Sequence, residues 1–314
     1  MGRYLLQRLS GMALMLLLIS VVSYSMVRLL PGDPVVAMLG EQGDPHVVAR
    51  VRADLGLDQP APLYFFVWVG RVLRGDFGRS IQSNKPVIEL MRDRLVPTLE
   101  LSLMAAALAV VIALPLGIAA AVWRSSPTDL GASAFAMVGL SIPDFCLGLV
   151  LILLFSVSLH WLPPSGWRDP FRDPVASLRY MLLPALTLAL GFGATIMRQV
   201  RTSMLNVLRQ DYLRTARAKG LGERPVTLRH ALRNALIPIV TVIGLMVGRL
   251  LGGAVVVETI FAIAGIGRMG VDAIFSRDYP IVQGVVLMIA AIVLVINLIV
   301  DLVYGWVDPR IRYT

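Results

Sequence analysis

The chain has 314 residues, of which 57% are hydrophobic and only 16% are charged. Water-soluble domains are about 25% charged, so this composition predicts an integral membrane protein built of helices. The net charge is +9, which in a membrane protein usually reflects topology, and we expect no nucleic-acid partner. The single cysteine, Cys146, lies in an apolar run, where we expect a packed thiol and no internal disulfide.

Six segments have the length and hydropathy of helices that cross a hydrocarbon core of about 30 Å. They are Leu9–Leu30, Thr98–Trp123, Ala132–Leu159, Tyr180–Met197, Leu236–Phe261 and Ile281–Tyr304. The first could instead be a signal peptide, because Arg3 and Arg8 precede it. Its apolar run is longer than a signal core, however, and no small-residue cleavage pattern follows, so we favour an uncleaved span. The predicted fold class is an all-α integral membrane protein with six transmembrane helices.

The distribution of lysine and arginine predicts the orientation of these spans. The segment 198–233 contains nine basic residues against two acidic ones, and short loops with such an excess are cytoplasmic. With six spans, both termini are then cytoplasmic too. The chain is thereby divided into an N-terminal transmembrane helix (1–30), an extracytoplasmic region (31–97) and a five-helix core (98–314) with the cytoplasmic loop 198–236. The extracytoplasmic region is too small for an enzyme domain and is expected to be a cap or docking surface at the external mouth of a pore.

The sequence carries no pattern for catalysis, and we predict no catalytic, cofactor-binding or metal-ligating residue. Lys85 precedes proline and Lys219 precedes glycine, so neither completes the phosphate-binding GxxxxGK[ST] loop. The three histidines lie far apart and have no cysteine partners that would suggest a metal site. The run Gly265–Gly270 matches GxGxxG but lacks the acidic residue expected about 20 positions later. We interpret it as a turn at the external end of the fifth span.

The predicted cytoplasmic loop has the most informative pattern. Leu205, Leu208, Tyr212 and Ala216 recur at spacings of three and four, which predicts an amphipathic helix. The run Lys219–Gly222 then breaks this helix, and Pro225 starts another one toward the membrane. A basic helix lying on the anionic inner leaflet is one interpretation. The length of the loop favours a second one, in which it docks with a cytoplasmic partner.

This loop resembles the EAA loop of ABC importer permeases, in the form found in the dipeptide, oligopeptide and nickel family. The main matches are DYLRTARAKGL at Asp211–Leu221 and HALRNALIP at His230–Pro238. Shorter matches follow in family order at Leu30–Pro34, Leu55–Pro60, Gly75–Gly78, Pro97–Glu100, Leu162–Pro164, Leu251–Gly253, Glu258, Arg277–Pro280 and Asp308–Tyr313. The run Arg214–Gly220 is most similar to glutathione and dipeptide permeases. Arg214 and Thr215 replace the Glu and Ala of the general pattern, so a contact that depends on that Glu is not carried over.

The resemblance implies a type I permease of an ABC importer in the bacterial cytoplasmic (inner) membrane. Such a permease pairs with a homologous second permease, two cytoplasmic ATPases that hold ATP and Mg²⁺, and an external solute-binding protein. The implied cargo is a dipeptide, an oligopeptide or a glutathione-like peptide, with nickel or another small solute as the alternative. Matching positions imply ATPase-coupling roles for Asp211, Tyr212, Ala216, Lys219, Gly220 and Leu221. A self-sufficient secondary transporter and a membrane scaffold are the other classes, and we find no inverted repeat that would favour the former.

Charged residues inside the predicted spans are candidates for a translocation pathway, because each is costly in lipid. Asp144 follows Pro143 in the third span, and Arg249 lies in the fifth. We interpret Arg249 as a buried cation that lines the pathway, with a structural ion pair or snorkelling as the alternatives. Gly244, Gly248 and Gly252 recur every four residues beside Val247 and Arg249. This glycine face predicts either tight helix packing or the wall of a narrow pore.

Overall fold

The computed structural model describes residues 2–28, 35, 44–54, 56 and 58–307. These residues form helices and their connections, and their only β-type pairing is an isolated bridge between Arg79 and Pro86. The all-α prediction is therefore confirmed. Five helices are long and apolar enough to cross a membrane, and a bent pair of helices is the sixth candidate.

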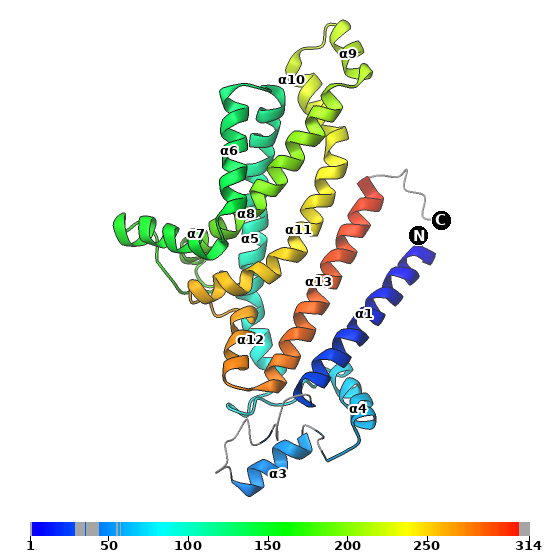
Figure 1. Cartoon of the computed structure of the whole chain (residues 1–314), viewed down its shortest axis with the longest axis vertical. Helices are drawn as coiled ribbons and strands as arrows, with labels where there is room; N and C mark the ends of the chain where they lie inside the picture. The colour runs from blue at the N-terminus through cyan, green and yellow to red at the C-terminus, as the bar shows by residue number, and fades with distance from the viewer. Residues whose placement is uncertain (1, 29–34, 36–43, 55, 57, 308–314) are drawn as a thin grey trace. The chain divides into compact units, whose positions relative to one another are not determined.

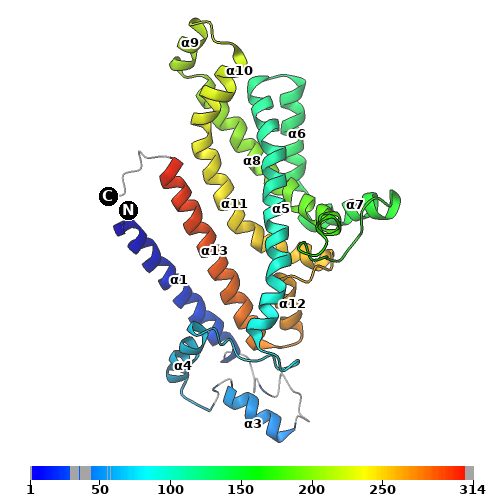
Figure 2. The same ribbon diagram turned by 180° about the vertical axis from the view of Figure 1, so that it is seen from behind.

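The predicted spans correspond to helices that are mostly longer than expected (Figures 1 and 2). The helices are α1 (Gly2–Arg28), α3 (Pro45–Asp54), α4 (Ala61–Leu73), α5 (Val87–Val122), α6 (Pro127–Ser141), α7 (Asp144–Leu151), the π-helix η1 (Ile152–Ser158), α8 (Pro174–Leu208), α9 (Asp211–Ala218), α10 (Glu223–Pro225), the π-helix η2 (Val226–Ala231), α11 (Leu232–Ile260), α12 (Ile266–Phe275) and α13 (Tyr279–Val307). Hydropathy finds only the part of a helix that lies in lipid. In α5 and α8 the helical hydrogen bonding continues beyond the apolar segment that hydropathy identifies. The predicted matches at Leu30–Pro34 and Asp308–Tyr313 lie outside the described residues.

The chain forms two compact units. The first comprises the described residues of 2–98 together with 264–295, and the second comprises residues 99–263 and 296–307. Helix α5 passes from the first unit to the second at residue 98, where the five-helix core was predicted to begin. The segment 264–295, which the predicted core included, belongs to the first unit.

The first unit has a core of apolar side chains from α5, α12 and α13. Val87, Met91, Ile266 and Val282 are among its buried members. Thr98 caps the start of α12, because its hydroxyl oxygen accepts a hydrogen bond from the Ile266 backbone N–H at 2.8 Å. The GxGxxG run is thus the beginning of a helix, whereas we expected a turn there. The short Pro97–Glu100 match has a structural role at this point.

The second unit is organised around α8, which packs against α6, α7 and α11. Small residues allow close approach: a Cβ at Gly139 would lie 3.0 Å from the Ala194 side chain, and one at Gly193 would lie 3.5 Å from the Ala109 carbonyl oxygen. Such contacts between small residues are typical of packed membrane helices. Glu100 of α5 accepts hydrogen bonds from the Trp167 indole, at 2.8 Å, and from the Ser177 hydroxyl. The connection before α8 is thereby fixed to α5.

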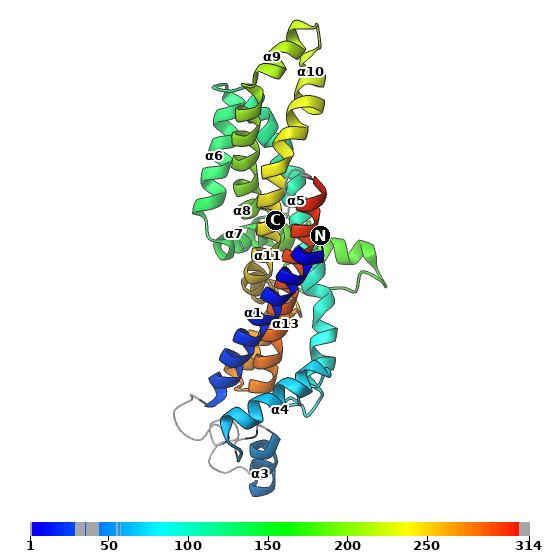
Figure 3. The same ribbon diagram turned by 90° about the vertical axis from the view of Figure 1, so that its right-hand side faces the viewer.

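The predicted third span, Ala132–Leu159, is not a straight helix. Helices α6 and α7 meet at an angle of 106°, and Figures 1 and 3 show α7 turning away from α6. The break lies at Ile142 and Pro143, which both have extended backbone. Proline lacks a backbone N–H and disfavours helical geometry in the residue before it. Helix α6 has 15 residues and is about 22 Å long, which is shorter than the hydrocarbon core.

Candidate functional site

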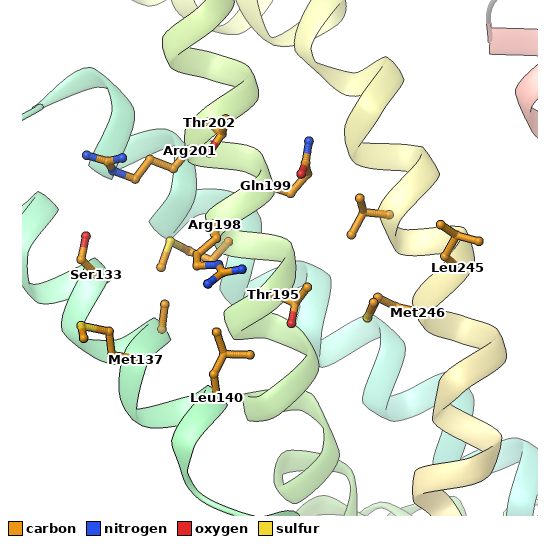
Figure 4. A pocket seen from close by; sticks show the side chains of 13 residues that line it. Ser133, Met137, Leu140, Thr195, Arg198, Gln199, Arg201, Thr202, Leu245 and Met246 are labelled. Carbon is orange, nitrogen blue, oxygen red and sulfur yellow. The ribbon is translucent and has the colours of Figure 1, made fainter.

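Two features of the second unit gather the residues that bear on function. The connection between α8 and α11, residues 209–231, lies at the same end of this unit as the connection between α5 and α6, and projects beyond it (Figures 1 and 3). We call residues 209–231 the elbow. The second feature is a groove along α6, α8 and α11, which Figure 4 shows from close by.

The elbow begins with a break that we did not predict. Helix α8 ends at Leu208, and Gln210, with extended backbone, precedes α9. The continuous amphipathic helix expected across Leu205–Ala216 is therefore wrong. Helix α9 is anchored by Leu213, which is fully buried among apolar side chains that include Met204 and Val226.

The coupling residues predicted in α9 lie on its outer surface or at its rim. The Tyr212 ring is 43% exposed, and its hydroxyl accepts a hydrogen bond from Asn234 Nδ2 at 2.7 Å. Asp211 is exposed and Ala216 is half-buried. The Tyr212–Asn234 bond ties α9 to the first turn of α11.

The tip of the elbow is the predicted glycine break. Gly220 has φ +83°, and no atom lies within 4 Å of the position that a Cβ would occupy. Glycine is the residue that adopts this backbone at no steric cost. Arg217 spans the break with a two-point ion pair to Glu223, at 2.8 and 3.4 Å. Lys219 and Leu221 remain exposed, so the tip offers an ordered, basic surface.

The second arm of the elbow starts at Glu223, close to the predicted Pro225. It passes through the π-helix η2, in which Val226 and Ala231 are fully buried. Helix segments with π geometry are uncommon and are frequent at functional sites. From η2 the chain continues into α11 as one helical run, Glu223–Ile260.

The predicted glycine face of α11 divides into two parts. Gly244 is buried, and a side chain there would overlap Val300 of α13. Gly252 is exposed and has open space around it. Residues four apart advance about 40° beyond a full helical turn. The face therefore rotates along the helix, so that its first glycine packs and its last one does not.

Arg249 is exposed in this chain, so no other part of the described chain buries it, and its burial against a partner stays a prediction. It shares an uncovered face of α11 with Leu245, which is 58% exposed, and Val256, which is 46% exposed. Val247 and Gly248 are half-buried beside it. Apolar side chains at this exposure in a membrane helix need lipid or another protein to cover them.

The groove has a volume of about 530 Å³. Figure 4 shows Arg198 and Thr195 on α8, between Leu140 of α6 and Met246 of α11. Gln199 and Thr202 of α8 also line it. This polar face of α8 was not predicted, because the apolar window of the fourth span ended at Met197. Its signal was the spacing of three and four between Thr195, Arg198 and Thr202.

An ion pair holds one wall of the groove in place. Arg201 Nε and Nη2 donate to the two Asp129 carboxylate oxygens at 2.6 and 2.8 Å. Asp129 lies in the first turn of α6, where its carboxylate also accepts from the Ser125 backbone N–H at 3.0 Å. The pair therefore fixes the start of α6 against α8. The two residues are 72 positions apart, and no local pattern could pair them.

Comparisons with known proteins agree on one family. Residues 113–313 match the family described as binding-protein-dependent transport system inner membrane component. Residues 1–102 match the N-terminal region of the membrane components of such systems. The glutathione transport system permease protein GsiC of Salmonella typhimurium (strain LT2) is 44% identical over 313 residues, covering 100% of both chains. The probable peptide ABC transporter permease protein y4tP of Sinorhizobium fredii is 41% identical over 314 residues, again covering 100% of both.

The solved structures that resemble this chain share its fold. An inward-facing structure of the MetNI methionine ABC transporter has a chain with a TM-score of 0.59 at 19% identity, covering 70% of this chain and 96% of that one. At this level of identity the likeness concerns the fold alone.

Proposed function

This chain belongs to the family of binding-protein-dependent transport system inner membrane components, and we propose that it is one of two permeases in an ATP-driven importer of short peptides. The resemblance to importer permeases that the sequence indicated is confirmed by the family match. The chain is a multi-pass membrane protein homologous to glutathione and peptide importer permeases. We further propose which proteins it assembles with, how ATP hydrolysis is coupled to its movement, and that its cargo is a peptide.

The observation that carries the proposal is the geometry of the elbow. An ordered basic tip, Lys219–Leu221, is exposed, and α9 behind it is tied by Tyr212 to the helix that continues into the membrane. We propose that this tip docks into a cytoplasmic ATPase, and that each of two ATPases holds ATP and Mg²⁺. Movement of the ATPase then rotates or shifts α11, which changes the side from which the pathway is open.

The proposed topology follows from this assignment. The elbow and both termini are cytoplasmic, and residues 31–97 are extracytoplasmic, where a solute-binding protein delivers the cargo. The uncovered face of α11 around Gly248, Arg249 and Gly252 meets the second permease and lines the pathway in the bilayer of the bacterial inner membrane. Relatives at 41–44% identity are named for glutathione and peptides, which supports a peptide over nickel as the cargo.

Chemical cross-linking tests the docking of the elbow. In a Cys146→Ser background, a cysteine replaces Leu221, which is 41% exposed at the tip. We expect this cysteine to cross-link to the ATPase in the assembled complex, and the yield to change when ATP is added. The matched control places the cysteine at Leu63, which is 62% exposed in the proposed extracytoplasmic region. Cross-linking to the ATPase from position 63 but not from position 221 would refute the proposed docking.

A further inference from the structure

One face of α8 carries a row of polar residues and one glycine. Gly191, Thr195, Arg198 and Thr202 follow one another at spacings of four, three and four. Such positions lie on the same side of an α-helix. The opposite faces of α8 are apolar and buried, with Ile196, Met197 and Val200 in the core of the unit. This face is therefore a part of α8 that could contact a polar ligand.

Arg198 and Thr202 lie toward one end of this face. The Arg198 side chain is exposed and lines the groove. Arg201, three residues later, is paired with Asp129, whereas Arg198 forms no ion pair with any residue that the structure describes. An arginine in a membrane helix is costly unless an anion or water compensates it. A guanidinium in a groove suits a carboxylate, which it can bind through two parallel hydrogen bonds.

Asp144 marks the other end. A Cβ at Gly191 would lie 3.1 Å from Asp144 Oδ1, so this carboxylate lies directly against the bare backbone of the same face of α8. Asp144 is half-buried at the break between α6 and α7, and it too forms no ion pair among the described residues. A larger residue at position 191 would displace it. Because of the break between α6 and α7, the Asp144 carboxylate lies next to α8.

The two charges are opposite in sign to the ends of a short peptide, and the α8 positions beside which they lie are about as far apart as those ends. Positions 191 and 198 of α8 are seven residues apart, which is about 10 Å along the helix axis at 1.5 Å per residue. An extended peptide of three residues spans about 10 Å at 3.3–3.6 Å per residue. The groove beside Thr195 and Arg198 has a volume of about 530 Å³, which is in the range of small-ligand pockets. Asp144 is not among the residues that line this groove, and lies beyond its Leu140 end.

We propose that this face of α8 is a binding site for a zwitterionic tripeptide. Arg198 binds the terminal carboxylate, Asp144 binds the amino group, and the Thr195 hydroxyl lies between them. The apolar walls, Leu140 of α6 and Leu245 and Met246 of α11, take the peptide side chains. Methionine adapts its shape readily, so these walls suit side chains of different size. The site deepens the proposed function and rests on it, because it names the class of peptide that the permease carries.

The test uses the assembled complex in proteoliposomes and three forms of trialanine: unmodified, C-terminally amidated and N-acetylated. Arg198→Gln is expected to slow uptake of unmodified trialanine about tenfold at low concentration, since a charge-assisted hydrogen bond is lost. The same substitution should leave uptake of the C-terminally amidated peptide unchanged. Asp144→Asn should slow uptake of the unmodified peptide and leave uptake of the N-acetylated peptide unchanged. Arg172→Gln is the matched control, since this arginine is 89% exposed in another connection.

A second readout avoids selection by the solute-binding protein. A cysteine at Thr202, in the Cys146→Ser background, is labelled with an aqueous thiol reagent in the absence of that protein. Unmodified trialanine should slow labelling, and Arg198→Gln should abolish this protection. Equal changes in the uptake of all three peptides in either variant would refute the site. Slower labelling of the cysteine with anionic lipid and no peptide would also refute it. A wild-type complex that hydrolyses ATP but takes up no peptide would instead refute the proposed function.

Discussion

Gly220→Val is expected to reduce ATP-driven uptake at least about tenfold while the protein still inserts and assembles. Gly220 has φ +83° and open space around it, so the new side chain overlaps nothing in this chain. Its cost to the fold is the backbone strain alone, about 1–2 kcal/mol. At the tip of a docking surface, by contrast, a branched side chain disrupts a central contact, which typically costs about 2 kcal/mol or more.

Gly75→Val is the matched control for this experiment. Gly75 also has φ +83° and no atom within 4 Å of a Cβ position, so valine introduces the same strain at a site outside the elbow. We expect the Gly75 variant to retain uptake, and the Gly220 variant to lose uptake while ATP hydrolysis continues. Equal rates of coupled uptake in the two variants would show that the elbow tip does not transmit movement.

Arg201→Leu is expected to destabilise the protein by about 3 kcal/mol. The substitution leaves the Asp129 carboxylate, whose side chain is 10% exposed, without its partner, and breaking a buried pair typically costs about 3–5 kcal/mol. We place the effect at the lower end because the Arg201 side chain is 29% exposed. The measurement is the thermal unfolding midpoint of the purified protein in detergent.

The double variant Asp129→Asn with Arg201→Leu separates the charge from the packing. Asparagine keeps a side-chain oxygen for the Ser125 backbone N–H and removes the unpaired charge. We expect the double variant to regain most of the stability that Arg201→Leu loses. If it is less stable than Arg201→Leu alone, the cost lies in lost packing around the arginine, and the ion pair is not what fixes α6 to α8.

Local sequence signals predicted the parts of the fold that local physics determines. The apolar windows located the membrane helices, and the run Lys219–Gly222 located the left-handed glycine at the elbow tip. The bend at Pro143 had a local signal too, but apolar residues on both sides of the proline were interpreted as one span. Hydropathy measures transfer to lipid and carries no information on the direction of the helix axis.

Properties that depend on distant parts of the chain could not be predicted. The Asp129–Arg201 pair joins the start of α6 to α8, and the position of Asp144 against Gly191 depends on the 106° bend between α6 and α7. Arg249 was expected to be buried, because an arginine in an apolar span usually faces protein. In the structure its face of α11 is uncovered, and covering it is a property of the complex rather than of this chain.

Uptake of trialanine into proteoliposomes tests directly whether this chain is a permease of an ATP-driven importer. The vesicles contain this chain, the second permease and the two ATPases, and the solute-binding protein is added outside. We predict accumulation against a concentration gradient that requires ATP, the binding protein and all four membrane-associated subunits. Accumulation by this chain alone, driven by an ion gradient without ATP, would contradict the account and identify a secondary transporter.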